Sequence, residues 1–161
     1  MFELIYLFFV MIIQVIIPPI PAELIVLDAA SRNGIIITTF FAGSGLFIGS
    51  LCVFFFSSYL RNFFKLETVK PIENKFQKYG IWILLIRVLP YNPSDIISYA
   101  AGILRFDKKK YVFITFFTSY SRVFLLSLLG ITISSLFDLI LIFFLLFLSG
   151  LVISYYLYKK K

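Results

Sequence analysis

The longest stretch of this sequence without a charged residue, Asn33 to Leu60, exceeds the roughly 20 residues that an α-helix needs to cross a bilayer. A second uncharged stretch runs from Leu139 to Tyr158, and a third, from Tyr111 to Ile131, carries only Arg122. Hydrophobic residues make up 61% of the 161 residues and charged residues 14%, more apolar than a soluble domain of this size. The sequence therefore predicts an all-α integral membrane protein.

Two further apolar regions are interrupted by proline, and they resemble each other. The interruptions are pairs of prolines, Pro18 and Pro21 within Leu4–Arg32, and Pro90 and Pro93 within Ile81–Leu104. Because proline removes a backbone donor and the residue before it avoids the helical region, each pair ends one helix and begins another. Glu23 aligns with Asp95 when the prolines are superimposed, and small residues follow in both copies. We therefore predict an internal repeat, with repeat one at about 4–60 and repeat two at about 80–131.

The placement of basic residues predicts how the repeats sit in the membrane. Basic residues gather at 61–78, at 105–110 and at the C-terminus. All three groups face the same side only if 81–104 enters the membrane and returns, and the positive-inside rule assigns that side to the cytoplasm. The group at 61–78 also fits an amphipathic helix on the membrane surface, although topology alone accounts for its charge.

The predicted fold is a single membrane domain, 1–161, with inverted topology. It has two opposed re-entrant helical hairpins, three full transmembrane helices, a basic cytoplasmic loop at 61–79 and a last transmembrane helix at 139–158. We expect it in the cell membrane of a prokaryote, with the basic loops and the C-terminus in the cytoplasm.

The residue inventory excludes several classes of function. The chain has no histidine and one cysteine, Cys52, so it has no disulfide within the chain, no Cys/His zinc site and no histidine-dependent triad. With no recognisable nucleophile and base, we expect neither an enzyme nor a bound metal or cofactor. The net charge of +7 follows topology and lipid headgroups, and we expect no nucleic-acid partner.

Five charged residues are predicted to lie within the membrane: Glu23, Asp28, Arg87, Asp95 and Arg122. Such residues cost roughly 2.5 to 3.5 kcal/mol each on insertion scales and usually face the interior of a bundle, where they have a partner. Three acids against two arginines leave one carboxylate without a partner. Proton coupling or gating is therefore a candidate role for the acids.

Structural alternatives stand beside these roles. Glu23 and Asp95 each follow a proline by two residues, where an acid caps the first turn of a helix. Asp28 fits a solvated position at a hairpin mouth. Gly45 and Gly49 have the spacing of a helix-packing motif, within one chain or between chains of a homo-oligomer.

The two arginines are candidate substrate-binding residues. Arg87 lies three residues before Pro90, near the predicted tip of the second hairpin, where a guanidinium can bind phosphate in a bidentate manner. Arg122 lies in the middle of a span and is predicted to contact substrate or to form an ion pair with one of the three acids. Asn92, between the prolines of the second tip, is a further candidate substrate ligand.

The segments "PPIPAEL" and "RVLPYNPSDIISYAAGILRF", each followed by a full span, resemble the DedA or VTT-domain superfamily, also called SNARE-associated Golgi proteins. The resemblance covers roughly Ile17 to Ile131. It implies two opposed re-entrant hairpins, with Glu23 as the acid of the first and Arg87 as the arginine of the second. The bacterial branch has another arginine where this chain has Pro93, so the chain is closer to the branch shared with eukaryotic members.

The resemblance also implies movement of lipids between leaflets, either polyprenyl-phosphate carriers or phospholipids. We therefore expect a flippase or scramblase for lipids with phosphate-containing headgroups, with protons as a further partner. The alternatives are an ion-coupled transporter of a small solute and a membrane scaffold that transports nothing.

Overall fold

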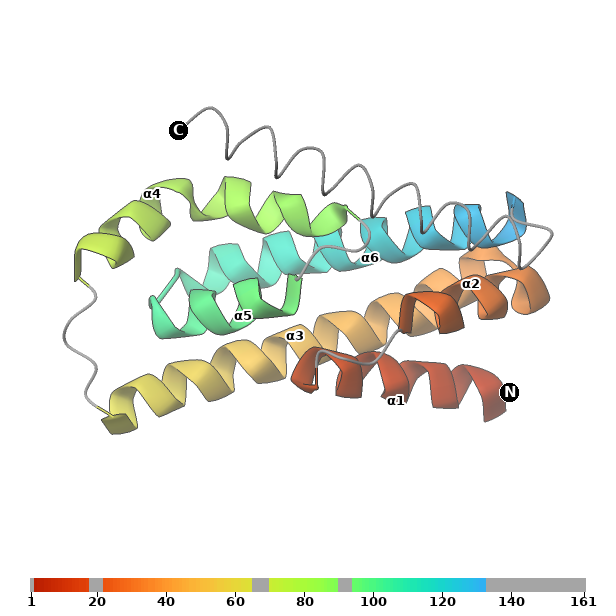
Figure 1. Cartoon of the computed structure of the whole chain (residues 1–161), viewed down its shortest axis with the longest axis horizontal. Helices are drawn as coiled ribbons and strands as arrows, with labels where there is room; N and C mark the ends of the chain where they lie inside the picture. Colours follow the sequence, from red (N-terminus) through yellow and green to blue (C-terminus); the bar gives the residue numbers. More distant parts are fainter. Residues whose placement is uncertain (1, 18–21, 65–69, 90–93, 133–161) are drawn as a thin grey trace, which may run out of the picture. The chain divides into compact units, whose positions relative to one another are not determined.

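The structure, a computed structural model, describes residues 2–17, 22–64, 70–89 and 94–132, and in these ranges it is entirely helical apart from short turns (Figure 1). The helices are α1 (Phe2–Ile16), α2 (Ala22–Asn33), α3 (Ile35–Phe64), α4 (Lys70–Leu85), the 3₁₀ turn η1 (Ile86–Val88), α5 (Ser94–Ile103) and α6 (Lys108–Thr132). The chain divides into two compact units at Ile131, and the first unit contains these helices up to that residue. The predicted helix at 139–158 lies outside the described residues.

The helix ends are set by local chemistry. Gly34 separates α2 from α3 and has φ +81°, a left-handed conformation that glycine adopts without steric cost. After α5, the amide of Phe106 donates to the carbonyl of Ala101 at 3.0 Å, the Schellman pattern of a helix C-terminus. The Asp107 carboxylate then accepts from the amide of Lys110 at 2.8 Å and caps the start of α6. These two caps reverse the chain between α5 and α6.

The described helices reproduce the internal repeat. α5 begins 72 residues after α2, and α6 begins 73 residues after α3. Each repeat therefore consists of two shorter helical arms followed by one long helix. Within α3 and α6, the segments Ile35–Arg61 and Lys108–Ile131 are long and apolar enough to span a membrane. They correspond to two of the three predicted spans.

The two long helices run antiparallel. Their contacts pair ascending positions on one helix with descending positions on the other: Thr39 with Ser127, Ser44 with Tyr120, Phe47 with Phe116, and Phe54 with Tyr111. Figure 1 shows the same opposite directions for α3 and α6. Equivalent helices of the two repeats therefore point in opposite directions, as an inverted repeat requires.

The helical hairpins α1–α2 and α4–α5 open at opposite ends of α3 (Figure 1). Glu3, at the start of α1, lies 4.0 Å from Arg32, at the end of α2, which directly precedes the start of α3. Arg61, near the other end of α3, contacts Glu73 of α4 at 3.0 Å and the carbonyl of Ile103 at 2.7 Å. The two helical pairs therefore open in opposite directions, and their re-entry into a membrane stays a prediction.

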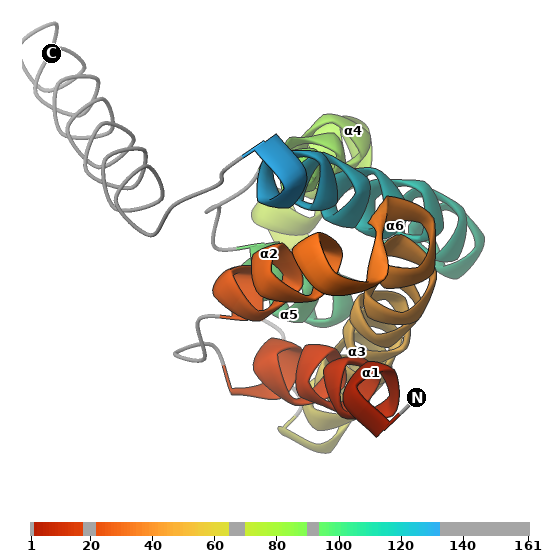
Figure 2. The same cartoon turned by 90° about the vertical axis from the view of Figure 1, so that its right-hand side faces the viewer.

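Each hairpin has its own apolar core, and both cores include the long helices. The first is formed by Leu7, Met11, Val15, Val26, Ala42, Leu46, Val53, Val123 and Leu126. The second is formed by Phe54, Phe76, Leu84, Ala101, Leu104, Phe106 and Tyr111. The hairpins also touch each other, because the Tyr99 hydroxyl donates to the carbonyl of Ile16 at 3.2 Å. Figure 2 shows α2 and α5 near the centre of the bundle.

The glycine motif of α3 packs inside the chain. A Cβ added to Gly45 would collide with the backbone carbonyl of Phe8, and one added to Gly49 would lie 2.9 Å from the carbonyl oxygen of Ile12. Both contacts are with α1, so the absence of side chains lets α1 and α3 approach closely. Of the two predicted roles of the glycine motif, the structure shows the packing of two helices within one chain.

The connection between the repeats is more helical than a simple loop. α3 continues to Phe64 and α4 begins at Lys70, so the described parts of the basic segment 61–79 are helical. Arg61, near the end of α3, and Glu73, near the start of α4, form an ion pair across the connection.

Candidate functional site

Arg87 lies in η1, at the end of the first arm of the second hairpin, and its side chain is buried. Its guanidinium donates to the hydroxyl of Ser50 at 2.7 Å, of Thr115 at 3.3 Å and of Tyr111 at 3.4 Å. The Tyr111 hydroxyl in turn donates to the backbone carbonyl of Ser50 at 3.1 Å. The arginine therefore lies where η1, α3 and α6 meet, and neutral hydroxyl groups hold it there.

Among the side chains that the structure describes, which do not include that of Asp95, the Arg87 site has no negative charge. None of the ion pairs formed within those residues includes Arg87. Its Nε atom is buried and has no hydrogen-bond partner. A guanidinium carries five N–H donors, and the three hydroxyl contacts do not use all of them. A buried charge without a counter-charge is costly, so the chemistry of the site is suited to an anion.

Arg122, in the middle of α6, has a different partner. It is also buried, and its Nη2 donates to the Glu23 carboxylate at 2.6 Å. Glu23 is in the first turn of α2, where the positive end of the helix dipole also favours a negative charge. Among the three acids predicted as partners of Arg122, Glu23 is therefore one that bonds it. The ion pair joins the first hairpin to the long helix of the second repeat.

Arg122 and Thr115, which contacts Arg87 from α6, lie on one face of that helix. Thr115, which contacts Arg87, precedes Arg122 by seven residues. Seven residues are almost two helical turns and rise about 10 Å, so both positions point to the same side of the helix. Ser119 lies between them on that side and is buried. This face of α6 therefore contacts Arg87, which has no carboxylate partner among the described side chains, and carries Arg122, which bonds the Glu23 carboxylate.

Asp28 lies away from both arginines. Its carboxylate accepts from the Arg32 Nε at 3.1 Å, and both side chains are exposed. Because Arg32 also approaches Glu3, this cluster marks the mouth of the first hairpin. The location agrees with the solvated alternative considered for Asp28.

Several predicted site residues lie outside the part of the chain that the structure describes. These are the hairpin-tip residues Pro18, Pro21, Pro90, Asn92 and Pro93, and the side chain of Asp95. Their roles stay predictions.

Sequence reasoning missed the hydroxyl partners of Arg87. Ser50 directly follows Gly49 of the packing motif, and its hydroxyl makes the shortest contact to Arg87. Tyr111 and Thr115 are four residues apart, as are Thr115 and Ser119. This spacing of polar residues along an apolar helix is the signal that could have revealed a buried polar face.

A second feature missed from the sequence is the bonding at the mouth of the second hairpin. Arg61 is buried and bonds both Glu73 and the carbonyl of Ile103. Gln77 donates to the carbonyl of Arg105 at 2.6 Å. These side chains satisfy carbonyls left free at the end of α5 and fix both arms of the hairpin to α3.

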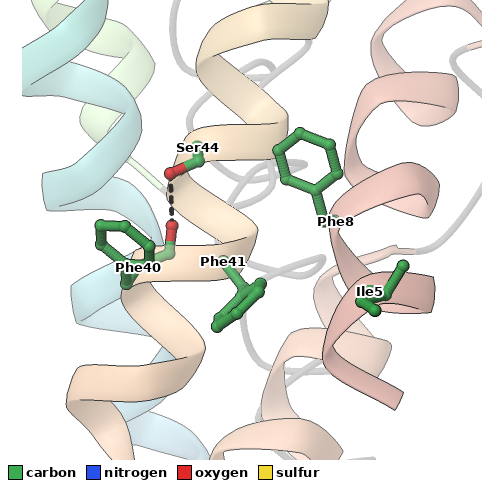
Figure 3. A pocket seen from close by; sticks show the side chains of 5 residues that line it. All are labelled: Ile5, Phe8, Phe40, Phe41 and Ser44. Atoms are coloured by element: carbon green, nitrogen blue, oxygen red, sulfur yellow. Dashed lines mark hydrogen bonds between the residues drawn. The ribbon is translucent and has the colours of Figure 1, made fainter. Parts of the chain in front are cut away.

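A cavity of about 240 Å³ lies between α1 and α3, away from the arginines (Figure 3). Its lining is Ile5 and Phe8 from α1, and Phe40, Phe41 and Ser44 from α3. The Ser44 hydroxyl donates to the carbonyl of Phe40 at 2.6 Å, drawn as a dashed line in Figure 3, and also bonds the Tyr120 hydroxyl. The cavity wall is therefore apolar and suits hydrocarbon better than a charged group.

The model of the VTT domain matches residues 19–132, a range that includes Glu23, Arg87 and Arg122. The chain belongs to the VTT domain family. The match confirms the resemblance to the DedA/VTT superfamily, whose members are generally membrane proteins. No curated protein and no solved structure matches the chain. Within the described residues of this VTT domain, no group of three His, Cys, Asp or Glu side chains could hold a metal ion.

Proposed function

We propose that this VTT domain moves phosphate-bearing lipids between the two leaflets of a membrane and that Arg87 binds the headgroup. The observation that carries the proposal is the buried Arg87 guanidinium, which has hydroxyl partners but no carboxylate among the described residues. A headgroup phosphate supplies the missing negative charge and forms the strong, charge-assisted bonds that arginine makes with phosphate.

The proposal places α3, α6 and the segment 139–158 across the bilayer and both hairpins within it as re-entrant elements. α1 has 15 residues and rises about 22 Å, less than the roughly 30 Å hydrocarbon core. Large apolar side chains such as Ile36 and Trp82 are more than two-thirds exposed and would face lipid. The basic segments and the C-terminus face the cytoplasm of a prokaryotic cell in this arrangement.

The inverted geometry supports a path through the protein. Hairpins that open at opposite ends of α3 bring polar groups inward from both sides, and irregular backbone at that depth requires a buried or water-lined site. Arg87 contacts Ser50, which is 15 residues after the start of the 30-residue α3. The anion site thus lies near the middle of the proposed span, at the barrier that a headgroup must cross.

The Glu23–Arg122 pair has a second role in the proposal. While the pair is closed, its short bond keeps the Glu23 carboxylate and one end of the Arg122 guanidinium engaged with each other. We assign it the role of a latch between the first hairpin and α6. Protonation of Glu23 would open the latch, which is how proton coupling enters the mechanism.

The test is lipid transfer in liposomes that contain the purified protein and fluorescent phospholipids. A membrane-impermeant reductant bleaches the outer leaflet, and bleaching beyond that half reports transfer. The native chain should give such bleaching, Arg87→Ala should stop at the protein-free plateau, and Arg32→Ala should match the native chain. Equal transfer by native protein and Arg87→Ala would reject the proposed anchor.

The same assay separates the alternatives. If the native chain transfers no phospholipid, polyprenyl phosphate under a proton gradient is the next substrate to test. Uptake of a water-soluble anion without lipid transfer would favour a small-solute transporter, for which the Arg87 site is equally suited. Absence of every flux from folded protein would favour a scaffold.

A further inference from the structure

Four buried side-chain atoms among the described residues have no hydrogen-bond partner: Thr38 Oγ1, Arg87 Nε, Ser98 Oγ and Ser119 Oγ. A buried polar atom without a partner costs free energy, so such atoms are rare and call for an explanation. Arg87 belongs to the site, Ser119 lies on the α6 face that contacts Arg87, and Ser98 lies on α5, which packs against α3. Thr38 lies elsewhere, near the start of α3.

Ser98 lies on the face of α5 that packs against α3. Gly102, one turn later on the same face, is in such close contact with Phe54 and Ser57 of α3 that a Cβ would collide with them. The two helices run in the same direction (Figure 1), and beyond Gly102 the carbonyl of Ile103 accepts from Arg61 of α3. One turn back from Gly102 therefore brings Ser98 to the level of Ser50, the closest partner of Arg87.

Ser119 extends the hydroxyl row of α6 by one turn. It follows Thr115 by four residues and so occupies the same face, toward Arg122. Its neighbour Thr118 is buried to the same degree, but the Thr118 hydroxyl donates to the carbonyl of Thr115 at 3.3 Å. The two adjacent hydroxyls therefore differ, because one has a partner within its own helix and the other has none.

We propose that Ser98 and Ser119 are ligands for the same anion as Arg87, and that the three unpartnered donors bind the oxygens of one phosphate ester. This inference rests on the proposed function and specifies which residues recognise the headgroup. Among the described side chains, those of the site are one cation and neutral hydroxyls, and the Asp95 side chain is not one of the described ones. They match a singly charged phosphodiester, which brings several acceptor oxygens and one negative charge.

The test measures binding by thermal stabilisation of the purified full chain in detergent. The probes are phosphatidylglycerol in mixed micelles and, separately, inorganic phosphate. We expect Ser98→Ala and Ser119→Ala each to weaken binding about tenfold, the effect of losing one hydrogen bond to a charged group. Neither should lower the melting temperature of the ligand-free protein, because each removes a hydroxyl that has no partner there.

Two matched controls separate binding from structure. Thr118→Val removes a buried hydroxyl that has a partner, and Thr38→Val removes an unpartnered one outside the site. Both should bind the probes like the native chain. If Ser98→Ala does not fold, Ser98→Cys replaces it, because cysteine has the same branching as serine and is a poorer hydrogen-bond donor.

The outcomes distinguish this inference from the proposed function. Unchanged binding in both serine variants, with binding lost in Arg87→Gln, overturns the inference and leaves the headgroup anchor standing. Unchanged binding in Arg87→Gln, or no binding by the native chain, overturns both. Weaker binding in both serine variants supports the inference, and the probe that stabilises at lower concentration shows whether a lipid headgroup or free phosphate is the ligand.

Discussion

Arg87 and Arg122 are both buried near the middle of the protein, yet their surroundings differ. Arg122 donates to a carboxylate at 2.6 Å, whereas Arg87 contacts three hydroxyl groups at 2.7 to 3.4 Å. If burial were the only criterion, the two arginines would be given the same role. The difference lies in the partner. The Arg122 guanidinium is engaged by a carboxylate and joins α2 to α6, whereas the Arg87 guanidinium has only hydroxyl partners among the described side chains and is available to an anion.

The mouths of the two hairpins differ in a similar way. At the first mouth, Arg32 meets Asp28 and Glu3 with exposed side chains. At the second, Arg61 is buried and bonds both Glu73 and the end of α5. Exposed pairs contribute little to stability, while removal of a buried partner is costly. We therefore expect the mouth of the first hairpin to open more easily than the mouth of the second.

The largest expected effect is on transport by Arg87→Gln. Glutamine retains hydrogen-bonding capacity but removes the charge, so we expect lipid transfer to fall at least a hundredfold, to the protein-free rate. The free energy of unfolding should stay unchanged or rise, because a buried charge without a described counter-charge is removed. The paired measurements are the bleaching assay and unfolding in mixed micelles. If the Arg87→Gln protein unfolds more easily but still transfers lipid, Arg87 has a structural role and does not bind the headgroup.

The next effect is on stability and concerns the paired arginine. Arg122→Gln leaves Glu23 without this partner, so we expect a loss of about 3 to 5 kcal/mol in the free energy of unfolding. Adding Glu23→Gln should restore most of that loss, since the double variant has no unpaired charge at this position. If the loss of unfolding free energy in the double variant equals the sum of the losses in the two single variants, Arg122 and Glu23 do not stabilise the protein as a pair.

Arg61→Ala should have an intermediate effect. It removes one charged bond to Glu73 and one to the carbonyl of Ile103. We expect a loss of about 2 kcal/mol in the free energy of unfolding, by analogy with hydrogen bonds to charged groups. Amide exchange should increase first in α5, whose end Arg61 caps. Exchange that increases equally in α2 would contradict a local role.

Arg32→Ala should have the smallest effect. Its pairs with Asp28 and Glu3 are exposed, so the free energy of unfolding should change by less than about 1 kcal/mol. The same unfolding assay measures it. A loss as large as that of Arg61→Ala would mean that the two mouths do not differ in strength.

The repeat, the proline breaks and two of the spans could be predicted from the sequence. Long apolar runs and proline have consequences that depend on local sequence alone, so Asn33–Leu60 predicted α3 to within a few residues. The opposite directions of the two helical pairs agree with the prediction from the distribution of basic residues, while their re-entry into a membrane stays a prediction.

The partners inside the site could not be predicted in the same way. Arg122 and Glu23 are 99 residues apart, and three acids were equally compatible with the sequence. Ser50 appeared as a small residue beside a packing glycine, because serine fits tight helix contacts and polar sites alike. Only the relative positions of α3, η1 and α6 show that its hydroxyl contacts Arg87.

The most direct test of the central claim gives Arg87 the kind of partner that Arg122 already has. Ser50→Asp places a carboxylate beside the Arg87 guanidinium, and Ser50→Asn is the neutral control of the same shape. We predict that Ser50→Asp is at least as stable as Ser50→Asn but transfers no lipid, while Ser50→Asn retains most of the native rate. Full lipid transfer by a folded Ser50→Asp protein would contradict the claim that Arg87 must remain free to bind the headgroup.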